Sequence, residues 1–175
     1  MKYQSQLLIS IVLLAPLFLL ITGCDEQKDQ KMQDKNIEAI ESVLQKSLTG
    51  PDNELKKIFS SEEFTESINK YNEDHFSDFF TDQTSYIDFV NNYGAVLMTM
   101  PIRNEYTLKV KDIEYEKVNS DETIYNFSVD LEYQKEGNQE SKTEIVSGQA
   151  SLNDKHKIKN MIIRLDELWS SFESI

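Results

Sequence analysis

The chain has 175 residues, and its 31 acidic residues against 18 Lys and Arg give it a formal net charge of −13 at pH 7. Such a surface repels phosphate backbones, so the composition predicts no nucleic-acid partner. Cys24 is the only cysteine. An intramolecular disulfide is therefore excluded, so a packed core alone must stabilise the fold. The length of the chain indicates one domain.

The N-terminus has the pattern of an export signal. Lys2 precedes an apolar run from Leu7 to Ile21. The run has 15 residues and contains Pro16, whereas a membrane-spanning helix needs about 20. Ile21-Thr22-Gly23-Cys24 resembles a bacterial lipobox and matches poorly the cleavage site of an ordinary secretory signal. We predict a lipoprotein signal peptide over residues 1–23 and a protein on the extracytoplasmic face of the cell membrane, anchored in the lipid bilayer through acylated Cys24.

The segment after Cys24 is almost wholly polar. Residues 25–36 contain Asp, Glu, Gln and Lys with a single apolar residue, Met32. Low hydrophobicity without apolar periodicity predicts an acidic polar tether over residues 24–36. The alternative for its second half is an N-terminal extension of the next helix. Residues 37–175 then form a single α+β domain.

Apolar residues at helical spacing predict a first amphipathic helix between Ile37 and Leu48. Gly50 and Pro51 should end it, and Asp52 should begin a short second helix. A capping box is expected where Ser60 is followed by Glu63, before a third helix that carries Phe64, Ile68 and Tyr71.

A cluster of aromatic residues follows the third helix. Phe76, Phe79 and Phe80 lead into another helix, with Tyr86, Phe89, Val90 and Tyr93 on one face. We expect Gly94 to end that helix. The apolar run after it is too short to classify, and Pro101 should close it.

After Pro101 the apolar pattern alternates with a period of two. Tyr106, Leu108 and Val110 share one face, but the next apolar residue is Ile113, which predicts a bulge near Lys111-Asp112. The clearest strand carries Tyr125, Phe127, Val129, Leu131 and Tyr133 on its inward face. Two further strands are expected, one with Val146, Gly148, Ala150 and Leu152 on one face, and a last one over Ile158–Leu165 whose Met161-Ile162-Ile163 is apolar on both faces.

Helices followed by four strands joined through short turns predict an α+β fold, with N-terminal amphipathic helices packed on a curved four-stranded antiparallel sheet. This arrangement resembles the cone-shaped nuclear transport factor two-like superfamily. The stretch Thr49-Gly50-Pro51-Asp52-Asn53-Glu54-Leu55-Lys56-Lys57 and the turn-rich strands resemble small lipoproteins of low-GC Gram-positive bacteria. A cystatin-like helix on a four-stranded sheet is the alternative fold.

Chemistry-bearing motifs are scarce. The spacing of the glycines excludes a nucleotide-binding loop and a nucleophile elbow, and no cofactor or metal site is implied. Of the two histidines, His75 is the conceivable acid–base centre, because Asp74 adjoins it and Asp78 could form a dyad with it. Members of the cone-shaped superfamily place Asp and His inside their cavity, but a solvated acidic face is the simpler interpretation. The acidic run Glu73, Asp74, Asp78 and Asp82 lacks a calcium-loop pattern.

The inward aromatic residues Tyr106, Tyr125, Phe127 and Tyr133 are the candidate ligand-binding residues. They could line an apolar cavity with a few hydroxyls, although a packed core is the favoured interpretation. Trp169 and Phe172 could anchor a partner or pack on the sheet edge.

No carboxylate or imidazole is expected among the inward residues of the clearest strand. We therefore predict a non-enzymatic binding or assembly module with an envelope protein as partner. The alternative is a small-ligand-binding protein, or an isomerase- or dehydratase-like enzyme that uses the cone cavity.

Overall fold

The computed structural model describes residues 34–118, 120–165, 168 and 170. The predictions for the signal peptide, for Cys24, for the tether up to residue 33, and for Trp169 and Phe172 lie outside these residues. Within the described part, no helix has both the length and the apolar character that crossing a bilayer requires.

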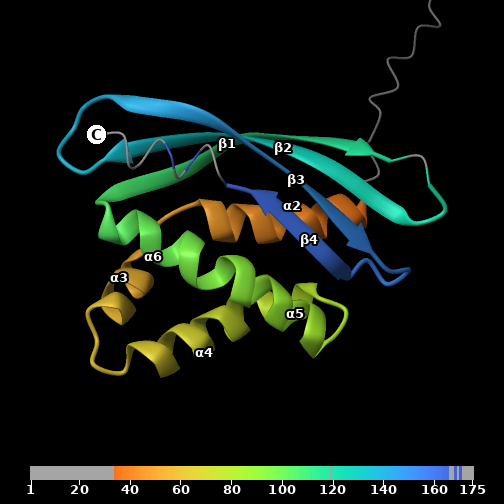
Figure 1. Ribbon diagram of the computed structural model, residues 1–175, viewed down its shortest axis with the longest axis horizontal. Coiled ribbons are helices and arrows are strands. Elements are labelled where there is room, and N and C mark those ends of the chain that lie inside the picture. Colours follow the sequence, from red (N-terminus) through yellow and green to blue (C-terminus); the bar gives the residue numbers. More distant parts are fainter. Residues whose placement is uncertain (1–33, 119, 166–167, 169, 171–175) are drawn as a thin grey trace, which may run out of the picture. The chain divides into compact units, whose positions relative to one another are not determined.

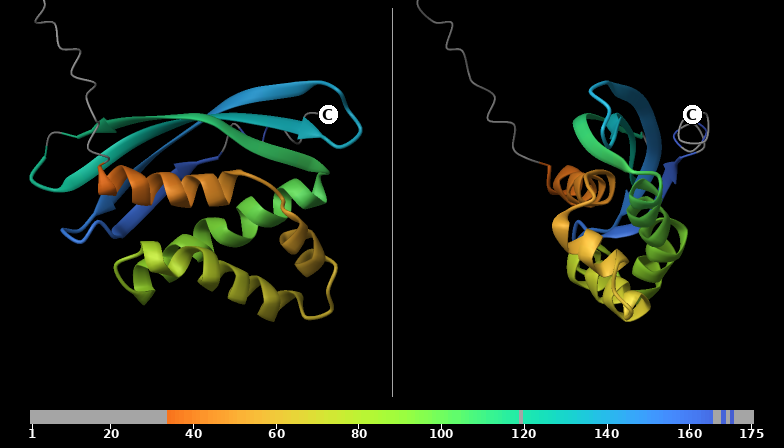
Figure 2. Two further views of the ribbon diagram at one scale, coloured as in Figure 1. Left: turned by 180° about the vertical axis from the view of Figure 1, so that it is seen from behind. Right: turned by 90° about the vertical axis from the view of Figure 1, so that its left-hand side faces the viewer.

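The domain is an α+β fold, as predicted (Figure 1). Its four strands form one antiparallel sheet in the order β1-β2-β3-β4. Figures 1 and 2 show a curled sheet with α2 lying against the strands, and with α4 farthest from them. The elements in chain order are α2 (Lys35–Leu48), α3 (Asn53–Phe59), α4 (Phe64–Phe76), η2 (Ser77–Phe79), α5 (Gln83–Phe89), η3 (Val90–Gly94), α6 (Ala95–Arg103), β1 (Tyr106–Lys117), β2 (Thr123–Lys135), β3 (Ser141–Leu152) and β4 (Ile158–Arg164).

The first two helices are where the apolar spacing predicts them. α2 begins two residues early, at Lys35, because the Asp34 side chain caps it by accepting a 3.0 Å hydrogen bond from the Asn36 N–H. Asp52 caps α3 in the same way, with a 2.7 Å bond from the Leu55 N–H. Between the helices, the backbone of Gly50 exchanges hydrogen bonds of 3.0 and 2.7 Å with Leu108, which ties the connection to β1.

The predicted capping box at Ser60 and Glu63 is wrong. Glu63 precedes α4 but makes no side-chain cap. Ser60 instead ends α3 in a helical conformation, and its hydroxyl donates to the Lys56 carbonyl at 3.1 Å. A hydroxyl turned back toward the preceding helix cannot cap the following one.

The predicted helix end at Gly94 is wrong, and Pro101 does not close the apolar run that precedes it. α5 continues through a π-helical turn, η3, directly into α6, and Pro101 lies inside α6. Gly94 has an ordinary helical φ of −55°. A Cβ there would lie 3.1 Å from Cγ1 of Val90, one turn earlier, and at an ordinary contact distance of 3.4 Å from Oδ1 of Asn72 in α4. The apolar run buries Leu97 and Met98 in the core, and this packing outweighs the local preference of Pro101.

The sheet follows the predicted register. β1 shifts register between Val110 and Asp112, which confirms the bulge. The five inward residues of β2 and the four of β3 are buried, as expected. In β4, Met161 and Ile163 are buried while Ile162 is 43 % exposed. The β3–β4 pair shifts register at Ser151/Leu152, so the apolar run belongs to a bulged strand that is covered on one side.

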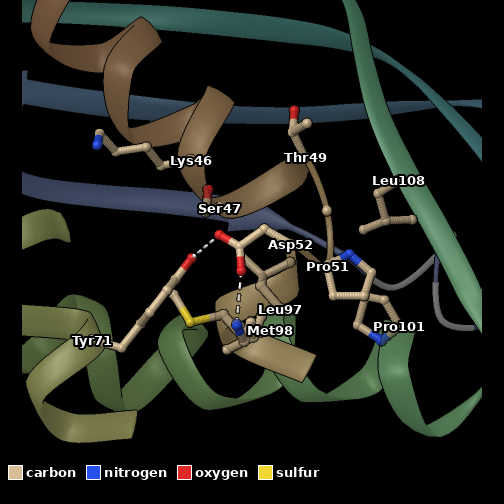
Figure 3. Close-up of a pocket in the computed structure, with 12 residues that line it drawn as sticks. Lys46, Ser47, Thr49, Pro51, Asp52, Tyr71, Leu97, Met98, Pro101 and Leu108 are labelled. Atoms are coloured by element: carbon tan, nitrogen blue, oxygen red, sulfur yellow. Dashed lines mark hydrogen bonds between the residues drawn. The ribbon is translucent and has the colours of Figure 1, made fainter. Parts of the chain in front are cut away.

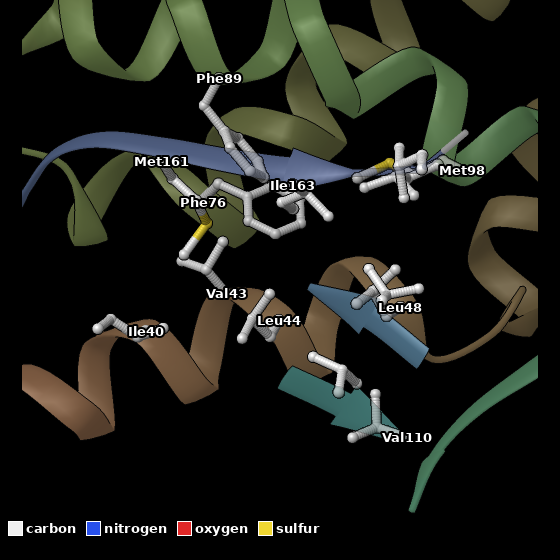
Figure 4. Packing of buried hydrophobic residues seen from close by; sticks show 14 of the residues in the cluster. Ile40, Val43, Leu44, Leu48, Phe76, Phe89, Met98, Val110, Met161 and Ile163 are labelled. Carbon is white, nitrogen blue, oxygen red and sulfur yellow. The ribbon is translucent and has the colours of Figure 1, made fainter. Parts of the chain in front are cut away.

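The core fills the space between the helices and the concave face of the sheet (Figure 4). Phe76 of α4 and Phe89 of α5 have ring centroids 5.4 Å apart, and they lie close to Met161 and Ile163 of β4. From α2, Val43 packs toward the same cluster. The aromatic residues that the sequence places between helix and strand are thus the centre of the fold.

Candidate functional site

The four candidate ligand-binding residues all face the interior. Tyr106, Tyr125, Phe127 and Tyr133 are only 2–4 % exposed. The rings of Tyr106 and Tyr133 meet edge-on at 5.8 Å. These side chains belong to one continuous hydrophobic cluster with the helices. Their inward orientation is confirmed, whereas binding of a ligand by them stays a prediction.

Tyr125 also links the sheet to the start of α2. The Tyr125 hydroxyl of β2 donates to the carboxylate of Asp34, which in turn caps α2. Burial and the hydrogen bond to this carboxylate raise the pKa of Tyr125 above its ordinary value. The polar end of Tyr125 is thereby occupied by a structural partner.

A small pocket lies where the end of α2, the start of α3, α4 and α6 converge (Figure 3). The carboxylate of Asp52 points into it and accepts hydrogen bonds from the Leu55 N–H and, at 3.1 Å, from the Tyr71 hydroxyl. Burial, and then the charge of Asp52, raise the pKa of Tyr71 above its ordinary value. The pocket has a volume of about 10 Å³, which is room for one water molecule. Its polar groups clamp α3 to α4.

His75 is not joined to Asp78. The imidazole of His75 stacks on the Tyr71 ring at 3.9 Å, and its Nδ1 donates to the Tyr71 carbonyl at 2.8 Å. Asp78 lies in η2 and uses its backbone carbonyl to accept from Lys157. Within the described part of the chain, no three His, Cys, Asp or Glu side chains come together in a way that could hold a metal ion. The His75 imidazole is thus oriented by a backbone carbonyl and not by the carboxylate of Asp78.

The structure also forms a groove that the sequence analysis does not predict. It lies between the first turns of α2, the η2 segment and the β3–β4 loop, and its volume is about 450 Å³. We call it the lysine groove, because its lining includes three lysines and a histidine but only two acidic residues. Its lining residues are Lys35, Glu38, Ala39, Ser42, Asp78, Phe79, Lys155, His156 and Lys157.

Two hydrogen bonds hold the lysine groove together. His156 has a left-handed φ of 61°, and its Nδ1 lies 2.9 Å from Oδ1 of Asn36. Lys157 donates to the backbone carbonyl of Asp78. The run Lys155-His156-Lys157 is visible in the sequence as a polar loop, but its position beside Lys35, 120 residues earlier, depends on the tertiary fold.

The comparisons with known proteins do not identify a family. No family model matches the chain, and no curated protein matches it. One solved structure with a similar course of the chain is the solution structure of TraH, a candidate transfer protein from the Gram-positive conjugative plasmid pIP501. It has a TM-score of 0.46 and 12% sequence identity, and the match covers 75% of this chain and 93% of that chain. This similarity is too low to support an inference about function.

Proposed function

We propose that the protein is a lipoprotein of the cell membrane whose extracytoplasmic domain acts as a non-enzymatic binding or assembly module. The anchor is argued from the sequence alone: Lys2, the apolar run and the lipobox-like residues that end at Cys24. The first described helix begins at Lys35. The segment from Cys24 to Asp34 could extend to at most about 35 Å, so acylation of Cys24 would keep the domain near the bilayer.

One observation carries the non-enzymatic part of the proposal. The inward side chains of β2, from Tyr125 to Tyr133, are all buried and carry neither a carboxylate nor an imidazole. The Asp52 pocket, with its volume of about 10 Å³, has no space for a substrate. An enzyme of the cone type would need an ionisable group aimed into a cavity, and these residues supply a packed apolar interior instead. Binding of a protein partner by the outer surface fits this arrangement better.

The anchor is tested by Cys24→Ala. We expect this variant to accumulate as an unprocessed precursor or to release the domain from the membrane, because the thiol that receives the lipid is gone. Fractionation of cells, with the mass of the N-terminal peptide measured in each fraction, checks the result. Thr22→Ser keeps a small residue two positions before the cysteine and serves as the matched control. A Cys24→Ala protein that is still processed and membrane-bound would refute the anchor.

The absence of catalysis is tested on the purified mature protein. We expect no turnover in assays for hydrolase, isomerase and dehydratase activity, because the inward residues of β2 include neither a carboxylate nor an imidazole. Any activity found is then measured in His75→Ala, with His156→Ala as the control for loss of an imidazole elsewhere. An activity that disappears in His75→Ala and persists in His156→Ala would establish the enzyme alternative.

A further inference from the structure

We infer that the lysine groove binds the phosphate of anionic phospholipid headgroups and thereby orients the domain on the membrane to which the proposed anchor attaches it. The inference rests on the proposed lipid anchor, and it concerns a different part of the chain. It follows from the position of the groove, from its charge and from the state of its side chains.

The groove lies at the end of the domain where the described chain begins. Lys35 is the first residue of α2, and Asn36 contacts His156 of the β3–β4 loop. Figures 1 and 2 show the start of α2 and the β3–β4 loop at the same end of the domain, and the β2–β3 turn at the opposite end. Because at most about 35 Å of chain separates Asp34 from Cys24, acylation of Cys24 keeps this end of the domain within that distance of the bilayer.

The charge of the groove differs from that of the chain. The whole protein has 31 acidic residues and 18 Lys and Arg, whereas the groove has three lysines against Glu38 and Asp78. A strongly acidic domain held beside an anionic membrane is repelled by it. Turning the lysine groove toward the bilayer reduces this repulsion and brings ammonium groups to the headgroup phosphates.

The side chains of the groove differ in how available they are. Lys157 already donates to the Asp78 carbonyl, and the carboxylate of nearby Asp34 is engaged by Tyr125. Lys35 and Lys155 are exposed, and no ion pair is found for either among the described residues. A phosphate would therefore contact these two ammonium groups first. The chemical reactivity of Lys35 and Lys155 should report whether a headgroup is bound.

The test measures how fast lysines of the full chain, purified from membranes, react with an amine-acylating reagent. The protein is placed on vesicles of neutral phosphatidylcholine, or on vesicles that also contain anionic phosphatidylglycerol. On anionic vesicles we expect the reactivity of Lys35 and Lys155 to fall about fivefold, and the effect to vanish at 1 M salt, where the Debye length is about 3 Å. Lys57 and Lys142, exposed on other parts of the domain, should be unchanged.

A matched pair of variants shows whether the groove acts as a unit. Lys155→Gln should weaken the protection of Lys35, whereas Lys142→Gln should leave it intact. Equal protection of Lys57 and Lys142 would overturn the inference by showing general attraction to the surface, and the absence of protection on anionic vesicles would overturn it directly. Inorganic phosphate that protects Lys35 and Lys155 on neutral vesicles would identify a site for soluble anions, and so would also contradict headgroup binding.

Flotation with vesicles tests the lipid anchor separately from the lysine groove. If the protein does not float with neutral vesicles, the proposed function fails. The groove is then tested on protein coupled through the Cys24 thiol to a maleimide lipid, with the same lysine readout. Protection of Lys35 and Lys155 in that form supports the inference, and its absence overturns it.

Discussion

Phe127→Ala is expected to lower the free energy of unfolding by about 3–5 kcal/mol, because removal of a buried aromatic ring costs the transfer energy of the ring and leaves a cavity. Phe127 is 3 % exposed. It lies in the middle of β2, opposite Gly148 of β3 and Tyr115 of β1. With β1 and β3 paired on either side, the strand cannot easily collapse into the vacated space. Urea denaturation followed by circular dichroism measures the loss.

The control is Asp130→Ala, on the opposite face of the same strand. Asp130 is half-buried, and its Oδ1 makes no hydrogen bond within the described part of the chain. Its removal should therefore cost far less than the loss of Phe127. Equal losses in the two variants would contradict the assigned faces of β2, and a larger loss in Asp130→Ala would mean that the strand is shifted by one residue, since such a shift exchanges the two faces.

The parts of the fold that could be predicted are those that follow from the spacing of apolar residues along the chain. The alternation from Tyr125 to Tyr133 defines both the strand and its buried face, and the jump of apolar phase from Val110 to Ile113 defines the bulge. Both signals come from residues close together in the sequence, and both report which face of a strand is buried. The α+β class follows from their order along the chain.

The parts that could not be predicted depend on contacts between distant residues. Gly94 looks like a helix end locally and Pro101 like the end of an apolar run, yet burial of Leu97 and Met98 in the core keeps the chain helical through both residues. The lysine groove has no local signature either, because it joins Lys35 to the β3–β4 loop. The spacing of residues along the chain shows which face of each element is apolar. It does not show that α2, η2 and the β3–β4 loop meet.

Gly148 lies where the sheet has no room for a Cβ atom, for a reason visible only in three dimensions. A Cβ at Gly148 would lie 2.2 Å from the carbonyl oxygen of Ile162 and 2.3 Å from Cζ of Phe127. Both distances are far below van der Waals contact. The Phe127 ring covers the bare backbone of its cross-strand partner, an arrangement in which an aromatic side chain fills the space that a glycine leaves.

Gly148→Ala should therefore lower the free energy of unfolding by about 1–3 kcal/mol or more, because both the ring and a neighbouring backbone carbonyl would have to move. Ser147→Ala, on the opposite face of β3, is the matched control and should have little effect. Combined with Phe127→Ala, the substitution should cost less than the sum of the two single losses, since the shorter side chain removes one of the two clashes. The Ile162 carbonyl remains in the way, so the double variant should stay less stable than Phe127→Ala. Chemical denaturation of all four variants gives the comparison, and strict additivity would show that the Phe127 ring does not lie over Gly148.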